Sequence, residues 1–90
     1  MSYHLFYHPD VTKDLAQLPK NIKNRIGKAI EARLIHDPFN YGDPLKRSLQ
    51  SFRKLRVGDY RVIYKVDGNK VIILKIGHRK EVYEKVFLRI

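Results

Sequence analysis

Apolar and polar residues alternate in two short runs, RKLRV (53–57) and YRVIY (60–64), which flank the dipeptide Gly58-Asp59. Such a dipeptide between alternating runs is typical of a two-residue β-hairpin loop, with the glycine at the position that needs positive φ. Pairing across this turn sets Val57 opposite Tyr60, Arg56 opposite Arg61, Leu55 opposite Val62 and Lys54 opposite Ile63. Two arginines therefore face each other, which destabilises a strand pair.

A third strand is predicted to follow this hairpin. Gly68-Asn69 is a second two-residue turn and sets Asp67 opposite Lys70. The run VIILKI (71–76) is apolar on both faces, as expected of a strand in the interior of a sheet. These segments together predict a three-stranded antiparallel meander.

Side-chain alternation divides the meander residues between two faces. The first face is apolar and should receive helices; it carries Leu55, Val57, Tyr60, Val62, Tyr64, Val66, Val71 and Ile73. The second face is half basic and half aliphatic; it carries Lys54, Arg56, Arg61, Lys65, Ile63, Ile72, Leu74 and Ile76. That mixture suits a partly covered concave site with the C-terminal segment as one wall.

The residues before the meander predict a strand and two helices. Residues 2–8 alternate like a strand, whereas 10–18 and 20–37 have the apolar spacing of amphipathic helices, hinged at Pro19 into a helical hairpin. Residues 38–51 contain two prolines and several turn formers, so they predict a connecting loop with one helical turn.

Residues 79–90 fit the periodicity of a helix and of a strand equally well, and their Glu, Lys and Arg content favours a helix. The predicted fold is therefore α+β, with an N-terminal strand, a helical hairpin, a three-stranded antiparallel meander and a C-terminal helix. We expect residues 1–90 to form a single domain.

Charge is the strongest compositional signal. The 90 residues carry 19 Lys and Arg against nine Asp and Glu, a net charge of +10. A basic surface of this density indicates a polyanionic partner, most often nucleic acid. The chain has no cysteine, which excludes thiolate chemistry, and no apolar run reaches membrane-spanning length. We expect a cytoplasmic protein with no membrane contact, metal ion or cofactor.

The cations of the second face converge at the Arg56–Arg61 pair. Lys54 lies two residues from Arg56 on the same side, and an anion bound between these groups would offset their repulsion. If the C-terminal segment is helical, Arg79 and Tyr83 share one side of it and add a guanidinium and a phenol to the edge of the cluster. This grouping is the candidate site.

Each of these side chains also has a structural interpretation. Arg61 could pair with Asp67 on its own face, and Tyr83 could be a core residue together with Phe87. The sequence leaves these interpretations open.

Three segments carry a resemblance to a known family: FYHPDVTKDLAQLP (6–19), KLRVGDYRVIYKV (54–66) and GHRKEVY (77–83). With the matching order of elements, the chain resembles the RelE/ParE superfamily of bacterial and archaeal toxins, on its RelE-like side. The resemblance implies the toxin of a type II toxin–antitoxin system, a ribosome-dependent mRNA endoribonuclease inhibited by an acidic antitoxin encoded beside it. It also implies a RelE-like fold, and a protein that forms oligomers only within the complex with its antitoxin.

Carried over by motif, the family's functional positions fall on Lys54, Arg56, Arg61, Arg79 and Tyr83. Some members have a further lysine two residues before the one that matches Lys54, and this chain has Phe52 there. Arg53 is a secondary candidate, but it is one position out of register and should face the helices or the rim of the sheet.

The residue types suit RNA cleavage, because the 2′-hydroxyl of RNA can attack the adjacent phosphorus without a metal ion. Lys54 is a candidate general base, since nearby Arg56 and Arg61 would favour its neutral form. An arginine fork suits the oxygens of the phosphorane, and Tyr83 suits stacking on a base. His78 is a candidate acid if it turns inward.

Two other functions stay open. A ParE-like toxin that poisons gyrase would not need the cationic cluster. A catalytically inactive RNA-binding toxin homologue would keep the cluster, and Phe52 in place of a second lysine leaves this alternative open.

Overall fold

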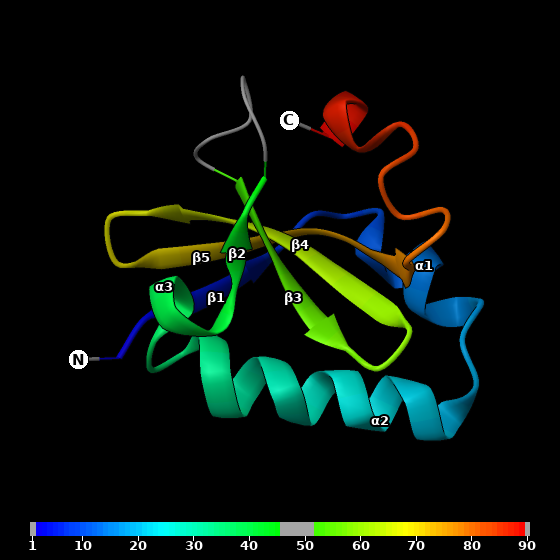
Figure 1. Ribbon diagram of the computed structural model, residues 1–90, viewed down its shortest axis with the longest axis horizontal. Helices are drawn as coiled ribbons and strands as arrows, with labels where there is room; N and C mark the ends of the chain where they lie inside the picture. Colours follow the sequence, from blue (N-terminus) through cyan, green and yellow to red (C-terminus); the bar gives the residue numbers. More distant parts are fainter. Residues whose placement is uncertain (1, 46–51, 90) are drawn as a thin grey trace.

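Five strands form one sheet in the computed structural model, which describes residues 2–45 and 52–89 (Figure 1). The spatial order is β1-β5-β4-β3-β2, with β1 parallel to β5 and all other neighbours antiparallel. The strands are β1 (His4–Tyr7), β2 (Asp43–Pro44), β3 (Phe52–Val57), β4 (Tyr60–Asp67) and β5 (Lys70–His78). The predicted strand and meander are confirmed, and β2 extends the meander from a segment predicted to be loop.

Both hairpin turns begin with a glycine in the left-handed region, with φ of 61° at Gly58 and 60° at Gly68. Asp59 and Asn69, the second residues of the two loops, do not share the positive φ, which is the type II′ pattern. The predicted register is confirmed throughout the first hairpin, including the directly opposed Arg56 and Arg61.

Helices cover one face of the sheet (Figure 1). They are α1 (Val11–Ala16), α2 (Lys20–Ala29) with a π-helical continuation (Ile30–Leu34), and the single turn α3 (Pro38–Tyr41). The core between helices and sheet consists of Val11, Ile26, Ile30, Leu34, Leu55, Val57, Val62, Tyr64, Val71, Ile73 and Ile76. Within residues 2–45 and 52–89, no helix has the length and apolarity needed to cross a membrane.

Ile76 lies on the helix-covered face, which corrects its predicted place on the basic face. The neighbours Ile63 and Tyr64 of β4 pair with residues on either side of Leu74, so Leu74 is an extra residue in β5. This β-bulge sets Leu74 and Lys75 consecutively on the second face and reverses the alternation beyond them. Leu74, as predicted, stays on the second face.

The C-terminal segment is not the predicted helix. Residues 79–85 form successive turns, Lys85 has a φ of 58°, and only Val86–Arg89 forms a short 3-10 helix, η3. Val82 and Val86 instead anchor the segment in a second core, on the face opposite the helices, with Phe52, Ile63 and Leu74. Burial of these two valines outweighs the helix propensity of the Glu and Lys residues around them.

Asp14 and Arg89 form a bidentate ion pair beyond the end of β1, with Nη1–Oδ2 and Nη2–Oδ1 distances of 2.6 and 3.0 Å. Their side chains are only 11% and 16% exposed, respectively. The carboxylate also accepts the backbone N–H of Ile76, and the guanidinium donates to the carbonyl of Leu74. Since β1 pairs with β5 only as far as Ile73, the pair satisfies the next β5 backbone groups and ties η3 to α1. The hydrogen bond to Asp14 raises the pKa of Arg89 above its ordinary value.

We expect Asp14→Ala and Arg89→Ala each to lower the free energy of unfolding by about 3 kcal/mol, the lower end of the range for a buried pair, because each leaves a largely buried charge without its partner. The double variant should lose less than the sum of the two single losses. Urea unfolding of all three variants measures the coupling.

Lys13→Ala is the matched control, because its ion pair with Asp10 is long, at 3.7 Å, and exposed. Its effect should stay within about 0.5 kcal/mol. Strictly additive losses at Asp14 and Arg89 would contradict the assigned coupling.

Candidate active site

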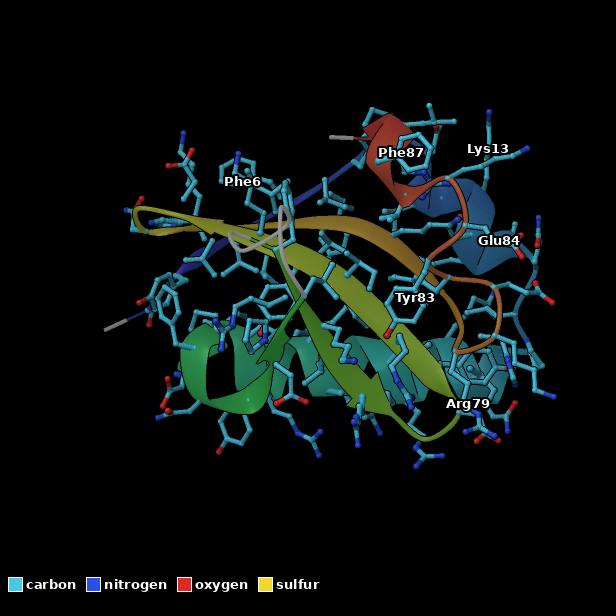
Figure 2. The ribbon with its side chains drawn as sticks, turned by 45° about the horizontal axis from the view of Figure 1, so that its top comes forward. Phe6, Lys13, Arg79, Tyr83, Glu84 and Phe87 are labelled. Carbon is cyan, nitrogen blue, oxygen red and sulfur yellow. The ribbon has the colours of Figure 1, made fainter. Side chains whose placement is uncertain are left out.

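A groove of about 550 Å³ lies between the sheet and the C-terminal segment. Strands β2 and β3 supply one side of it, and the turns before η3 together with η3 supply the other. Its lining residues are Asp43, Pro44, Leu45, Lys54, Arg56, Tyr83, Val86 and Phe87. Figure 2 shows Tyr83 and Phe87 on the side of the sheet that faces away from α2.

Lys54 and Tyr83 meet across this groove. The Nζ atom of Lys54 lies 5.8 Å from the centroid of the Tyr83 ring, within the range of a cation–π contact. Tyr83 is 40% exposed and Phe87 is 65% exposed, so neither is a core residue. The structure thus contradicts the interpretation of Tyr83 as core, and its ring is available to a ligand.

The two opposed arginines point to different partners. Arg56 lies beside Asp43, with 3.9 Å between Nε and Oδ2, and both side chains are about two-thirds exposed. Arg61 donates to the backbone carbonyls of Gly58 and Tyr60 at 2.9 and 2.8 Å. Among the described residues, the ion pairs do not include Arg61, so the predicted alternative pairing with Asp67 is not formed.

Arg79 and His78 lie at the edge of this arrangement. The backbone N–H of Arg79 donates to the carbonyl of Asp59, and its Nε lies 3.9 Å from the Asp59 carboxylate, so Arg79 is held at the β3–β4 turn (Figure 2). His78 packs edge-on against Tyr60, with ring centroids 5.6 Å apart, and accepts the N–H of Lys80. His78 is therefore not among the residues that line the groove.

Arg53 and Phe52 have structural roles in β3. Arg53 donates to the carbonyls of Phe39 and Gly42 at 2.8 and 2.7 Å, which holds α3 against the sheet, away from Lys54. Phe52 is on the same face as Lys54 but is 7% exposed and packs in the second core. The phenylalanine shares this core with Val86, which lines the groove; some members of the family have a lysine at its position.

Sequence reasoning missed the wall that Asp43, Pro44 and Leu45 contribute to the groove. A two-residue edge strand leaves no periodicity to detect, and the only local signal is a proline, which edge strands tolerate. Within residues 2–45 and 52–89, no three His, Asp or Glu side chains gather into a group that could hold a metal ion.

Comparison with known proteins identifies the family. The family model described as the ParE toxin of type II toxin–antitoxin systems matches residues 5–83 of the sequence. The toxin RelG of Mycobacterium tuberculosis is 30% identical over 87 residues, which cover 94% of this chain and 100% of RelG. The toxin RelE of the same organism is 31% identical over 83 residues, which cover 90% and 86% of the two chains.

Solved structures agree with these sequence matches. The toxin–antitoxin complex RelBE2 of M. tuberculosis contains a chain with a TM-score of 0.81 and 30% identity, and the match covers 88% of this chain and 100% of that one. A doubly substituted mutant of E. coli RelE in the free state has a TM-score of 0.77 at 20% identity, with 99% of this chain and 94% of that chain covered, and supports the fold alone. The chain belongs to the RelE/ParE superfamily, and it is a RelE-like toxin of the type II toxin–antitoxin class.

Proposed function

We propose that this toxin is an endoribonuclease that inhibits translation by cleaving mRNA on the ribosome. The observation that carries the proposal is the grouping of Lys54, Arg56 and Arg61 on one sheet face, with the Tyr83 ring over Lys54. A base, two phosphate-binding forks and a stacking surface are groups that metal-independent RNA cleavage can use.

In this mechanism the 2′-oxygen of the substrate attacks the adjacent phosphorus while Lys54 takes its proton. The new P–O2′ bond forms as the P–O5′ bond breaks, which leaves a 2′,3′-cyclic phosphate and a 5′-hydroxyl. Arg56 and Arg61 would stabilise the negative charge that develops on the phosphoryl oxygens. Water can protonate the departing 5′-oxygen, and Tyr83 would hold the neighbouring base by stacking.

An acidic antitoxin encoded beside the toxin is the proposed partner. The solved relatives include RelE chains in complex with RelB antitoxins. The exposed Phe87 and Leu88 of η3, at 65% and 71%, offer apolar surface next to the basic groove. An antitoxin segment that is both acidic and apolar would complement this surface.

Gyrase poisoning is the second candidate, because the matching family model is that of ParE toxins. A purified-gyrase assay with supercoiled DNA discriminates the two. Accumulation of cleaved DNA without cuts in ribosome-bound mRNA would replace the proposal with this alternative.

Arg61→Ala should lower the rate of mRNA cleavage about 10²–10³-fold, the scale expected when one charge-stabilising donor is removed. Its free energy of unfolding should change by less than about 1 kcal/mol, because relief of the repulsion with Arg56 opposes the loss of two carbonyl contacts. Arg61→Lys should restore little activity, since a point charge cannot replace the planar fork. Primer extension on ribosome-bound mRNA and thermal unfolding test both parts; an active but destabilised Arg61→Ala variant would refute the assigned role.

Lys54→Ala should lower cleavage about 10²–10⁴-fold if the lysine is the general base. Lys54→Arg keeps the positive charge but cannot accept a proton at neutral pH, so it should be as inactive as the alanine variant. Single-turnover cleavage of ribosome-bound mRNA separates the two roles of the residue. Activity retained by Lys54→Arg would show that Lys54 only supplies charge.

Binding of the acidic antitoxin should depend on salt mainly in its association rate, because the basic surface steers the encounter. The dissociation rate should change little with salt, since burial of apolar side chains such as Phe87 and Leu88 holds the final complex. Surface plasmon resonance between 0.1 and 1 M NaCl measures both rates. Over this range the electrostatic screening length falls from about 10 Å to about 3 Å. Rapid salt-induced dissociation would contradict the expected apolar interface.

A further inference from the structure

The strand register aligns four side chains in a row across the basic face. Phe6 of β1 pairs with Ile72 of β5, Ile72 pairs with Lys65 of β4, and Lys65 pairs with Phe52 of β3. Phe52 is two residues from Lys54 in the same strand, so the row lies on the same face as the candidate active site. With about 4.8 Å between strands, the row extends about 14 Å from β3 to the β1 edge.

A lysine contacts the aromatic ring at each end of this row. Lys65 has its Nζ 5.8 Å from the Phe52 ring centroid, and Lys70 has its Nζ 5.7 Å from the Phe6 ring centroid. The Lys54–Tyr83 contact in the groove is a third pair of the same kind. A small hollow of about 170 Å³, lined by Phe52, Lys65, Ile72, Leu74 and Arg89, lies in the row between the two ends.

The β1 end of the row is open to a ligand. Phe6 is 48% exposed, although it lies in a strand, and Lys70 is exposed as well. Asp67 lies opposite Lys70 in the hairpin, but neither residue takes part in an ion pair with the other described residues. Figure 2 shows Phe6 on the same side of the sheet as Tyr83 and far from it along the sheet.

We propose that Phe6, Lys65 and Lys70 form a track for single-stranded RNA that continues from the groove to the β1 edge. The proposal rests on the proposed function and extends it to the nucleotides that flank the cleaved phosphate. Phe6 stacks on an unpaired base, and the two lysines neutralise phosphates on either side. Aromatic rings with cations beside them on one surface are the chemistry that binds single strands without reading their sequence, whereas an acidic protein segment has no bases to stack on Phe6.

The test uses labelled RNA in which every 2′-hydroxyl is methylated, so that it binds without being cleaved. Fluorescence anisotropy compares an oligomer of about twelve nucleotides with one of about four, which is too short to occupy both groove and track. Phe6→Ala should weaken binding of the long oligomer about 5–150-fold, the range expected for loss of one stacked base, and leave the short one unchanged. Phe6→Tyr should bind like the wild type, whereas Phe6→Leu should resemble Phe6→Ala.

The lysines are tested through the salt dependence of the same binding. Lys70→Ala should reduce the slope of log K against log salt by about 0.7, the value for one phosphate contact on a single strand. Lys28→Ala removes the same charge from an exposed position of α2, on the covered side of the sheet, and should leave the slope unchanged. Equal effects of Lys70→Ala and Lys28→Ala on the slope would overturn the track, because RNA binding would then depend on the net charge of the protein and not on the position of the lysine.

Other outcomes also decide the proposal. The track is refuted if the wild type binds both oligomers equally, or if Phe6→Ala weakens binding of polyglutamate in place of RNA. Cleavage of ribosome-bound mRNA by the same preparations tests the proposed function separately. If Phe6→Ala weakens RNA binding but the wild type does not cleave mRNA, the track is supported and the endoribonuclease is refuted. If the wild type cleaves mRNA but Phe6→Ala binds RNA as tightly as the wild type, the endoribonuclease is supported and the track is refuted.

Discussion

The pairing register of β3 and β4 is the constraint on which the rest of this molecule depends. The turn at Gly58 fixes that register, and a slip of one residue would send every side chain of a strand to the opposite face. Lys54 and Arg56 then would enter the helix-covered core, and Leu55 and Val57 would enter the groove. Burial of the aliphatic side chains thus places the cations, even though the cations contribute no favourable energy to the pairing.

Repulsion between opposed cations is tolerated because the basic face also has its own source of stability. The second core packs Val82 and Val86 on Ile63 and Leu74, so the C-terminal segment is held by apolar burial directly beside the charges. The Asp14–Arg89 pair fixes the far end of the same segment. Charged and apolar side chains therefore occupy neighbouring positions on one surface, which accounts for the half basic, half aliphatic composition of this face.

Sequence patterns predicted the elements that residues close together in the chain determine. The glycine turns and the alternation in β3 and β4 specified both the hairpin and the facing of Lys54, Arg56 and Arg61. The conformation of residues 79–89 depends on contacts with distant residues such as Phe52 and Asp14, so no local pattern could reveal it. The bulge at Leu74 and the two-residue strand β2 likewise arise from pairing with other strands, and they determined the facing of Ile76 and the groove wall at Asp43.

The buried apolar residues form two clusters on opposite faces of the sheet. Each cluster stabilises its own part of the molecule, and the two parts can unfold separately. Among residues 2–45 and 52–89, the helix-side cluster holds eleven buried residues and the other cluster five, so the smaller unit can open while the larger stays folded. Backbone amides of the C-terminal turns would then exchange hydrogen with solvent by local opening, well before the amides of β4. One wall of the groove belongs to this smaller unit, and heat or denaturant can therefore dismantle the groove in a chain whose sheet and helices are still intact.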